Sequence, residues 1–113
     1  MTCIFCEIVK KNIPSQIVYE TDQVLAFKDI APVAPVHIVV IPKKHLKSVM
    51  EFDPEEGMLT VLLMRAIREI ASAQQLPENG FRVVTNVGSH GGQSVHHVHF
   101  HILGGRPMTW PPG

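Results

Sequence analysis

Four of the seven histidines fall between residues 96 and 101, and three of them alternate with large apolar residues. In an extended strand, every second side chain points to the same face of the sheet. The segment therefore predicts a strand over residues 95–103, with one set of side chains on an active face and the other in the core. The active set is His97, His99 and His101, and the core set is Val98, Phe100 and Ile102. Because alternate residues of a strand are about 6.6–6.8 Å apart, we expect a row of three imidazoles.

The rest of the chain predicts two helices and four more strands. Asp53-Pro54-Glu55-Glu56 supplies an N-cap carboxylate, a proline for the first helical position and a glutamate, so a long helix is expected from Asp53. Apolar residues then recur at helical spacing to Ala73, and Pro77 lies beyond the end. A short amphipathic helix is expected within residues 4–10. Runs of strand length between turn residues predict strands at 16–20, 24–29, 37–41 and 81–86.

This order of elements favours an α+β class. Short connections between successive strands predict an antiparallel five-stranded sheet with the helices on one face. The 113 residues match the size of one domain, expected to span 1–113. The long helix has a second apolar edge formed by Met58, Val61 and Met64, which is explained either by deep burial or by contact with a partner subunit.

Charge and composition exclude several classes. Ten basic residues balance ten acidic ones, so the chain lacks the positive surface expected for duplex DNA or an anionic membrane. The 45% apolar content argues against intrinsic disorder, and no apolar run approaches the roughly 20 residues that span a bilayer. The N-terminus shows no basic region followed by an apolar stretch, so a cytoplasmic location is expected.

Two chemistries fit the histidine segment. A His-x-His pair on a strand supplies two ligands to a metal. Alternatively, an imidazole acts as a nucleophile or an acid–base group on a phosphate, which needs hydrogen-bond donors beside it. Gly91-Gly92-Gln93-Ser94 offers backbone N–H groups, an amide and a hydroxyl immediately before the segment.

The pair Cys3-x-x-Cys6 has the spacing of half a zinc site. It does not follow a predicted strand, which argues against a thioredoxin-like redox motif. The alternative is a pair of small buried thiols, and two cysteines are too few for a disulfide scaffold.

Several blocks of the sequence together resemble the Hint branch of the histidine triad (HIT) superfamily. They are Gly91-Gly92-Gln93-Ser94-Val95, His97-Val98-His99-Phe100-His101-Ile102-Leu103-Gly104-Gly105-Arg106, Trp110-Pro111-Pro112-Gly113 and, upstream, Ala34-Pro35-Val36-His37-Ile38-Val39-Val40-Ile41-Pro42-Lys43-Lys44-His45. The resemblance extends to Ile4-Phe5, Ile13-Pro14, Ala26-Phe27 and Asp29-Ile30 and so covers nearly the whole chain.

The resemblance implies a five-stranded antiparallel sheet and a homodimer in which two sheets join into ten strands. It also implies a hydrolase that binds purine nucleotides, cleaves nucleoside phosphoramidates and aminoacyl adenylates, and needs no cofactor for catalysis. Within the superfamily, a dinucleoside polyphosphate hydrolase is an alternative, although the Trp110-Pro111-Pro112-Gly113 end resembles Hint proteins. A zinc-dependent hydrolase and a non-catalytic nucleotide-binding adaptor are further alternatives.

Roles for individual residues also follow from the resemblance. His99 matches the nucleophile that forms a nucleotidyl-histidine, and His37 and His97 match supporting histidines that orient groups or relay protons. His101, Ser94 and Gln93 match groups around the phosphate and leaving group. Asp29 matches the carboxylate that binds the ribose hydroxyls. The remaining substrate contacts are an apolar base slot of Phe5, Ile8, Phe27 and Ile30, and the neighbours of the phosphate Asn86, Gly92 and Val95.

The cysteine pair has a counterpart in some bacterial members of the superfamily, which complete a zinc site with two histidines. The matching ligands here are Cys3, Cys6, His45 and His97. A closed set of four ligands implies a structural zinc. On this interpretation the ring of His97 binds the metal and stabilises the strand that carries His99, and it does not relay protons.

Overall fold

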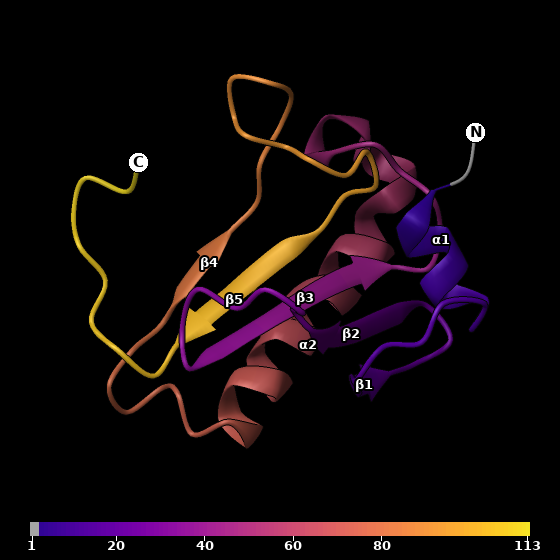
Figure 1. The fold of residues 1–113 in the computed structure, drawn as a ribbon. Coiled ribbons are helices and arrows are strands. Elements are labelled where there is room, and N and C mark those ends of the chain that lie inside the picture. Colours follow the sequence, from indigo (N-terminus) through magenta and orange to yellow (C-terminus); the bar gives the residue numbers. More distant parts are fainter. Residues whose placement is uncertain (1–2) are drawn as a thin grey trace.

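The structure is a computed structural model that describes residues 3–113. Its elements are α1 (Ile4–Val9), β1 (Ile17–Glu20), β2 (Val24–Lys28), β3 (Val36–Pro42), α2 (Gly57–Ala73), β4 (Arg82–Val84) and β5 (Phe100–Gly104) (Figure 1). The strands form one antiparallel sheet in the order β1-β2-β3-β5-β4. The predicted α+β class with five antiparallel strands, one short helix and one long helix is confirmed.

The long helix begins where the sequence predicts. The Asp53 carboxylate accepts a hydrogen bond of 2.9 Å from the backbone N–H of Glu55, which satisfies a donor that the first turn leaves free. The first turn, Pro54–Glu56, is a 3-10 turn that continues directly into α2. Past the end of α2, the Leu76 N–H donates to Ala71 O at 3.0 Å.

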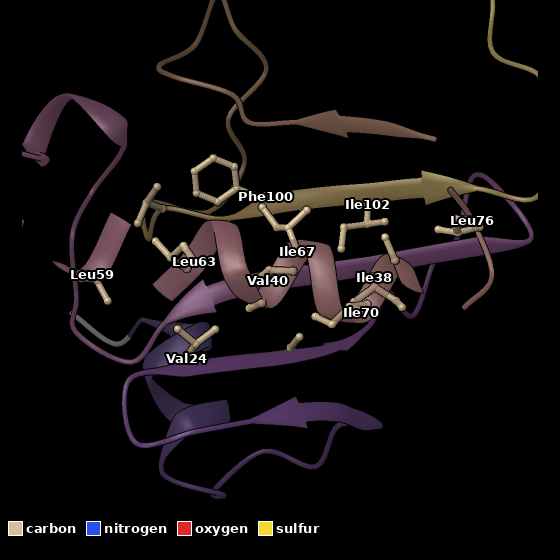
Figure 2. Close-up of a cluster of buried hydrophobic side chains, with 14 of the residues drawn as sticks. Val24, Ile38, Val40, Leu59, Leu63, Ile67, Ile70, Leu76, Phe100 and Ile102 are labelled. Atoms are coloured by element: carbon tan, nitrogen blue, oxygen red, sulfur yellow. The ribbon is translucent and has the colours of Figure 1, made fainter. Parts of the chain in front are cut away.

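Helix α2 covers one face of the sheet and forms the larger core with it. Figure 2 shows Leu63, Ile67 and Ile70 of α2 facing strand residues that include Val40 and Ile102. Leu63 and Ile102 have no exposed surface. Burial of this continuous apolar cluster is the main driving force for docking α2 on the sheet.

Helix α1 lies on the opposite face, so the prediction of both helices on one face is wrong. Its buried residues Phe5 and Ile8 form a second, smaller core with alternate residues of β2 and β3, namely Leu25, Phe27, Val39 and Ile41. The physical reason is that β2 and β3 are central strands with consecutive apolar residues, so both of their faces need a cover.

The last two strands are several residues shorter than predicted, whereas β1 and β2 are each shorter by one residue. The last strand starts at Phe100, whereas the prediction began at residue 95, and β4 covers only Arg82–Val84 of the predicted 81–86. Partners outside the sheet replace the expected strand pairing. The N–H of Val98 donates to the loop carbonyl of Leu46 at 2.6 Å, and the Thr85 hydroxyl donates to His99 O at 2.8 Å. His97 and His99 therefore precede the strand, and only His101 lies on it.

Neither helix within residues 3–113 has the length and apolar content needed to cross a membrane.

Candidate functional site

The three alternating histidines do not form an even row. His99 and His101 are neighbours, with ring centroids 5.0 Å apart and ring planes at 74°. The ring of His97 instead approaches Cys3, Cys6 and His45. Because the backbone before Phe100 is irregular, it directs these side chains differently from an extended strand. Two adjacent clusters result, one of imidazoles and one of sulfur and nitrogen ligands.

His99 has one nitrogen committed to the backbone. Its Nδ1 lies 2.7 Å from the carbonyl oxygen of His97, and the side chain is 4% exposed. A carbonyl only accepts, so Nδ1 carries the hydrogen and, in the neutral ring, Nε2 has the free lone pair. The ring of Phe5 packs edge-on against His99 with centroids 5.0 Å apart, which further restricts rotation of the imidazole.

A hydrogen-bonded chain links His101 to a loop. The backbone N–H of Val33 donates to Nδ1 of His37 at 3.1 Å, so in the neutral ring Nε2 of His37 carries the hydrogen. This Nε2 lies 2.8 Å from Nδ1 of His101 and 3.3 Å from Oδ2 of Asp29. When His37 donates to Nδ1 of His101, the remaining hydrogen of His101 is on Nε2. Nε2 of His101 is then a hydrogen-bond donor, whereas Nε2 of His99 has a free lone pair.

The environment of His101 favours its uncharged form. Burial lowers the pKa of His101 below the ordinary value of 6.5, and the neighbouring His99 and His37 lower it further. Asp29 acts in the opposite direction but does not outweigh these effects. At neutral pH the imidazole of His101 is therefore mostly neutral, so its Nδ1 can accept from His37 while its Nε2 donates.

Asp29, His37 and His101 bring three potential metal ligands together, all within 4.8 Å. Their hydrogen bonds do not suit a metal, because the Val33 N–H occupies Nδ1 of His37 and leaves the hydrogen on Nε2, the atom that faces the other two residues. A nitrogen that carries hydrogen has no lone pair to give. The cluster is better suited to ordering hydrogen bonds and holding protons.

The side-chain amide of Gln93 holds the glycine-rich loop before the histidines through hydrogen bonds to three backbone groups. Its amide oxygen accepts from the N–H of Gly88 at 2.9 Å, and its amide nitrogen donates to Lys47 O at 2.6 Å and Val95 O at 3.0 Å. Both ends of this amide thus hold the backbone, and its contact with a phosphate stays a prediction. Gly92 has a φ of +79°, a conformation that favours glycine.

Ser94 and Val95 follow this loop and line an open pocket of about 410 Å³ that Cys3 and His45 also line. Ser94 is exposed and Val95 is half-buried.

The residues expected to form the base slot occupy two different environments. Phe5, Ile8 and Phe27 are buried in the smaller core, with Phe5 and Phe27 in edge-on contact at 5.5 Å. Ile30 is 98% exposed on the loop after β2. Asn86 is half-buried beyond the end of β4. The described geometry therefore places Phe5 against the imidazoles but does not bring Ile30 into the same cluster.

The four predicted metal ligands converge. Nδ1 of His97 lies 3.4 Å from Sγ of Cys3, 3.5 Å from Sγ of Cys6 and 3.2 Å from Nδ1 of His45, which is 3.3 Å from Sγ of Cys6. A tetrahedral zinc with bonds of about 2.3 Å to sulfur and about 2.05 Å to nitrogen separates sulfur from nitrogen by about 3.5 Å and two nitrogens by about 3.3 Å. The side chains present therefore fit a zinc ion.

The hydrogen bonding of His97 supports the same conclusion. Its Nε2 lies 2.8 Å from Pro42 O and must donate, so Nδ1 is left with a lone pair directed at the cysteines. Burial lowers the pKa of His97, the hydrogen bond to Pro42 opposes this in part, and His45 and His99 lower it slightly further, so the net effect favours the neutral ring that a ligand requires. Burial and the adjacent Cys3 raise the pKa of the Cys6 thiol to about 11, so without a metal that thiol keeps its hydrogen.

Sequence reasoning missed the backbone groups that orient these rings. The three groups are the Val33 N–H, the His97 carbonyl and the Pro42 carbonyl. Every residue carries such groups, so no residue type marks them in the sequence.

Comparison with known proteins agrees with this geometry. A family model described as the HIT domain matches residues 10–108. An uncharacterized HIT-like protein of Synechococcus elongatus is 48% identical over 97% of this chain and 96% of its own. The crystal structure of a HIT family hydrolase from Legionella pneumophila matches with a TM-score of 0.97 and 45% identity, over 99% of this chain and 100% of that one. A histidine triad nucleotide-binding protein from Candida albicans matches with a TM-score of 0.83 and 31% identity, over 97% and 83% respectively.

Proposed function

The chain is a member of the HIT family, and we propose that it is a Hint-type hydrolase that cleaves nucleoside phosphoramidates or acyl and aminoacyl adenylates. The observation that carries this proposal is the orientation of His99. Its Nδ1 is held by the His97 carbonyl, which leaves Nε2 as a free nucleophile next to a second imidazole. The names of the hydrolase from Legionella and the nucleotide-binding protein from Candida support the same class.

In the proposed reaction, Nε2 of His99 attacks phosphorus, the bond from phosphorus to the leaving group breaks, and the leaving atom takes the proton from Nε2 of His101. Water then hydrolyses the nucleotidyl-histidine: its oxygen bonds to phosphorus, the bond from phosphorus to His99 breaks, and its proton returns to His101. His101 hydrogen-bonds the phosphoryl group or the leaving atom through its Nε2–H. Ser94 and the backbone N–H groups near Gly92 are the other donors assigned to the phosphate. Donors that are already in position lower the barrier because they need no rearrangement in the transition state.

For the nucleoside we assign Asp29 to the ribose. Its Oδ1 accepts from the Ala31 N–H at 2.8 Å, and each carboxylate oxygen has a further lone pair for a hydroxyl. The base would lie against the apolar group of Phe5, Ile8, Phe27 and Ile30, and Asn86, Gly92 and Val95 would lie beside the phosphate.

A test of the ribose assignment is Asp29→Ala, which should weaken binding of a nucleotide with an intact ribose by about tenfold or more, since each charge-assisted hydrogen bond contributes roughly 1.5–3 kcal/mol. A 2′,3′-dideoxy analogue should bind equally well to both proteins. Equal losses for the two ligands would show that Asp29 does not contact the ribose.

We further propose a homodimer in which the sheets of two copies join into ten strands and α2 contributes to the interface. Met58, Val61 and Met64 project from this helix and are 70%, 59% and 45% exposed, an apolar edge suited to a second copy. A cytoplasmic location fits the free Cys3 and Cys6, because thiols stay reduced there.

We assign the sulfur and nitrogen cluster to a structural zinc held by Cys3, Cys6, His45 and His97. The metal supplies a cross-link between the N-terminal segment, the loop after β3 and the segment that carries His99. Four protein ligands leave no open position for a substrate, which favours this role over the zinc-dependent hydrolase.

The decisive experiment is mass spectrometry of the intact protein during turnover of an adenosine phosphoramidate. The expected result is a mass increase of one nucleotidyl group, located on His99 by peptide mapping. Turnover with no covalent adduct after a rapid alkaline quench, which preserves phosphorus–imidazole bonds, would favour the metal-hydrolase alternative. Nucleotide binding with no turnover would favour the adaptor, and a strong preference for dinucleoside polyphosphates would favour that other branch.

A further inference from the structure

We infer that Arg106 is a positioning residue for the pair His37–His101, acting through the backbone of Val33. The effect on catalysis rests on the proposed function, whereas the effect on the loop does not. Arg106 follows β5 and donates to the carbonyl of Val33 from two atoms, Nη2 at 2.9 Å and Nε at 3.3 Å. The N–H of the same residue, Val33, donates to Nδ1 of His37.

The loop that contains Val33 has few other attachments. The side chains of Ile30 and Val33 are 98% and 60% exposed, so they contribute little packing, and the buried apolar side chain of the loop is the small Ala34. Pro32 and Pro35 have no N–H to donate. Among residues 3–113, the backbone N–H of Asp29 closes this loop by donating to His37 O at 3.0 Å. Within the loop, the hydrogen bonds are the Ala31 N–H to Asp29, the Val33 N–H to His37, and the two from Arg106.

The chain turns after β5 in a way that brings Arg106 into contact with this loop. Gly105 has a φ of +89°, and a Cβ there would lie 2.8 Å from Cβ of Pro35. Glycine thus allows the chain to turn and to approach the loop closely. The third guanidinium nitrogen, Nη1, donates to Pro107 O at 3.0 Å, so the planar group is fixed at both ends.

Through Val33, Arg106 affects the orientation of the His37 ring and its hydrogen bond to His101. With Val33 held, its N–H keeps the hydrogen of His37 on Nε2, directed at Nδ1 of His101. Without Arg106, Val33 is free to move, its N–H leaves His37, and the His37 ring can rotate away from His101. We therefore expect turnover to fall while substrate binding changes little, because Arg106 itself is not assigned to substrate.

The matched pair of variants is Arg106→Gln and Arg82→Gln. Arg82 also donates from Nη2 to a backbone carbonyl of the C-terminal segment, Thr109 O at 2.8 Å, but it does not contact the loop. Arg106→Gln should lower kcat about tenfold with KM within about twofold, whereas Arg82→Gln should stay within about twofold in both. Arg106→Lys, which keeps the charge but not the planar group, should give an intermediate kcat.

A double-mutant cycle separates positioning from general loss of structure. If Arg106 acts through His37, adding Arg106→Gln to His37→Gln should lower kcat by less than about twofold. The same tenfold loss in both backgrounds would overturn the inference, as would equal kcat for the two arginine variants.

An activity-independent measurement completes the test. Amide hydrogen exchange of Val33, followed by NMR, should become at least about tenfold faster in Arg106→Gln and stay unchanged in Arg82→Gln. Unchanged exchange in Arg106→Gln would overturn the inference even if kcat fell. Faster exchange in a protein that lacks phosphoramidase activity would support the role of Arg106 and reject the proposed function.

Discussion

The two faces of the sheet are built on different principles. The face under α2 is a continuous apolar core, in which Leu63, Ala66 and Ile102 are fully buried. The opposite face combines the small core under α1 with the imidazoles, and His37, His97 and His99 are nearly as buried as the apolar residues. Within residues 3–113, no buried side-chain nitrogen or oxygen lacks a hydrogen-bond partner.

The side chains of the two faces are therefore held in place by different interactions. Apolar burial is non-directional, so the α2 face needs only side chains of suitable size on the correct side. A buried imidazole without partners is strongly disfavoured, so the histidine face needs a hydrogen-bond partner at each ring, which is a backbone group for His37, His97 and His99 and the ring of His37 for His101. Changes on the α2 face should therefore affect mainly stability, and changes on the histidine face mainly chemistry.

His99→Ala should have the largest effect. Removal of the proposed nucleophile should lower kcat by at least about 10³-fold, because the covalent route is lost. Nucleotide binding should remain within a few-fold, as measured by calorimetry. Retention of more than a few per cent of activity, with contaminating enzyme excluded, would contradict the assignment.

Leu63→Ala should show the opposite profile. Truncation of a leucine with no exposed surface should lower the free energy of unfolding by about 2–5 kcal/mol, measured by denaturant titration. The kcat of the folded protein should stay within about twofold. The control is Arg65→Ala, whose exposed ion pair with Glu69 on the same helix contributes less than about 0.5 kcal/mol. A large fall in kcat for Leu63→Ala below its unfolding transition would show that the two faces are not independent.

Removal of zinc from the predicted site on the histidine face should lower the stability by less than Leu63→Ala does. Protein purified without chelator should contain about one zinc per chain, and the double variant Cys3→Ser, Cys6→Ser should contain none. Its Tm should fall by several degrees, since the cross-link is absent from the unfolded chain, and turnover should persist. Elemental analysis of reduced protein that shows no metal would reject the site. Loss of all turnover on mild chelation, restored by zinc in a folded protein, would favour the metal-hydrolase alternative.

The pH dependence of stability should show the smallest effect. Burial holds the pKa of His101 below 6.5 in the folded state, so the unfolded chain binds a proton first as the pH falls. Stability present above about pH 6.5 is therefore lost as the pH falls from there through the lower folded-state pKa. His101→Gln should show a smaller loss of Tm between pH 7.5 and 5.5, with zinc removed from both proteins. Identical losses would show that His101 does not contribute.

Much of the fold was predictable from local patterns. The Asp53 cap and the apolar spacing to Ala73 correctly predicted α2, and alternation near Phe100 correctly placed His101 and Ile102 on opposite faces of a strand. The start of β5 was not predictable, because the Val98 N–H bonds to Leu46, far away in the sequence. The positions of α1 and α2 on opposite faces likewise depend on which cores their apolar residues join.

For the site, the sequence by itself determined which side chains are present and that they alternate with apolar residues. It also determined the spacing of Cys3 and Cys6, which predicted two of the four converging ligands. Only the tertiary structure decided which nitrogen of each ring is free. That choice depends on a hydrogen bond to a backbone group, as from His97 to Pro42 and from Val33 to His37. Since all residues share the same backbone groups, their positions around a ring are defined only when the chain has folded.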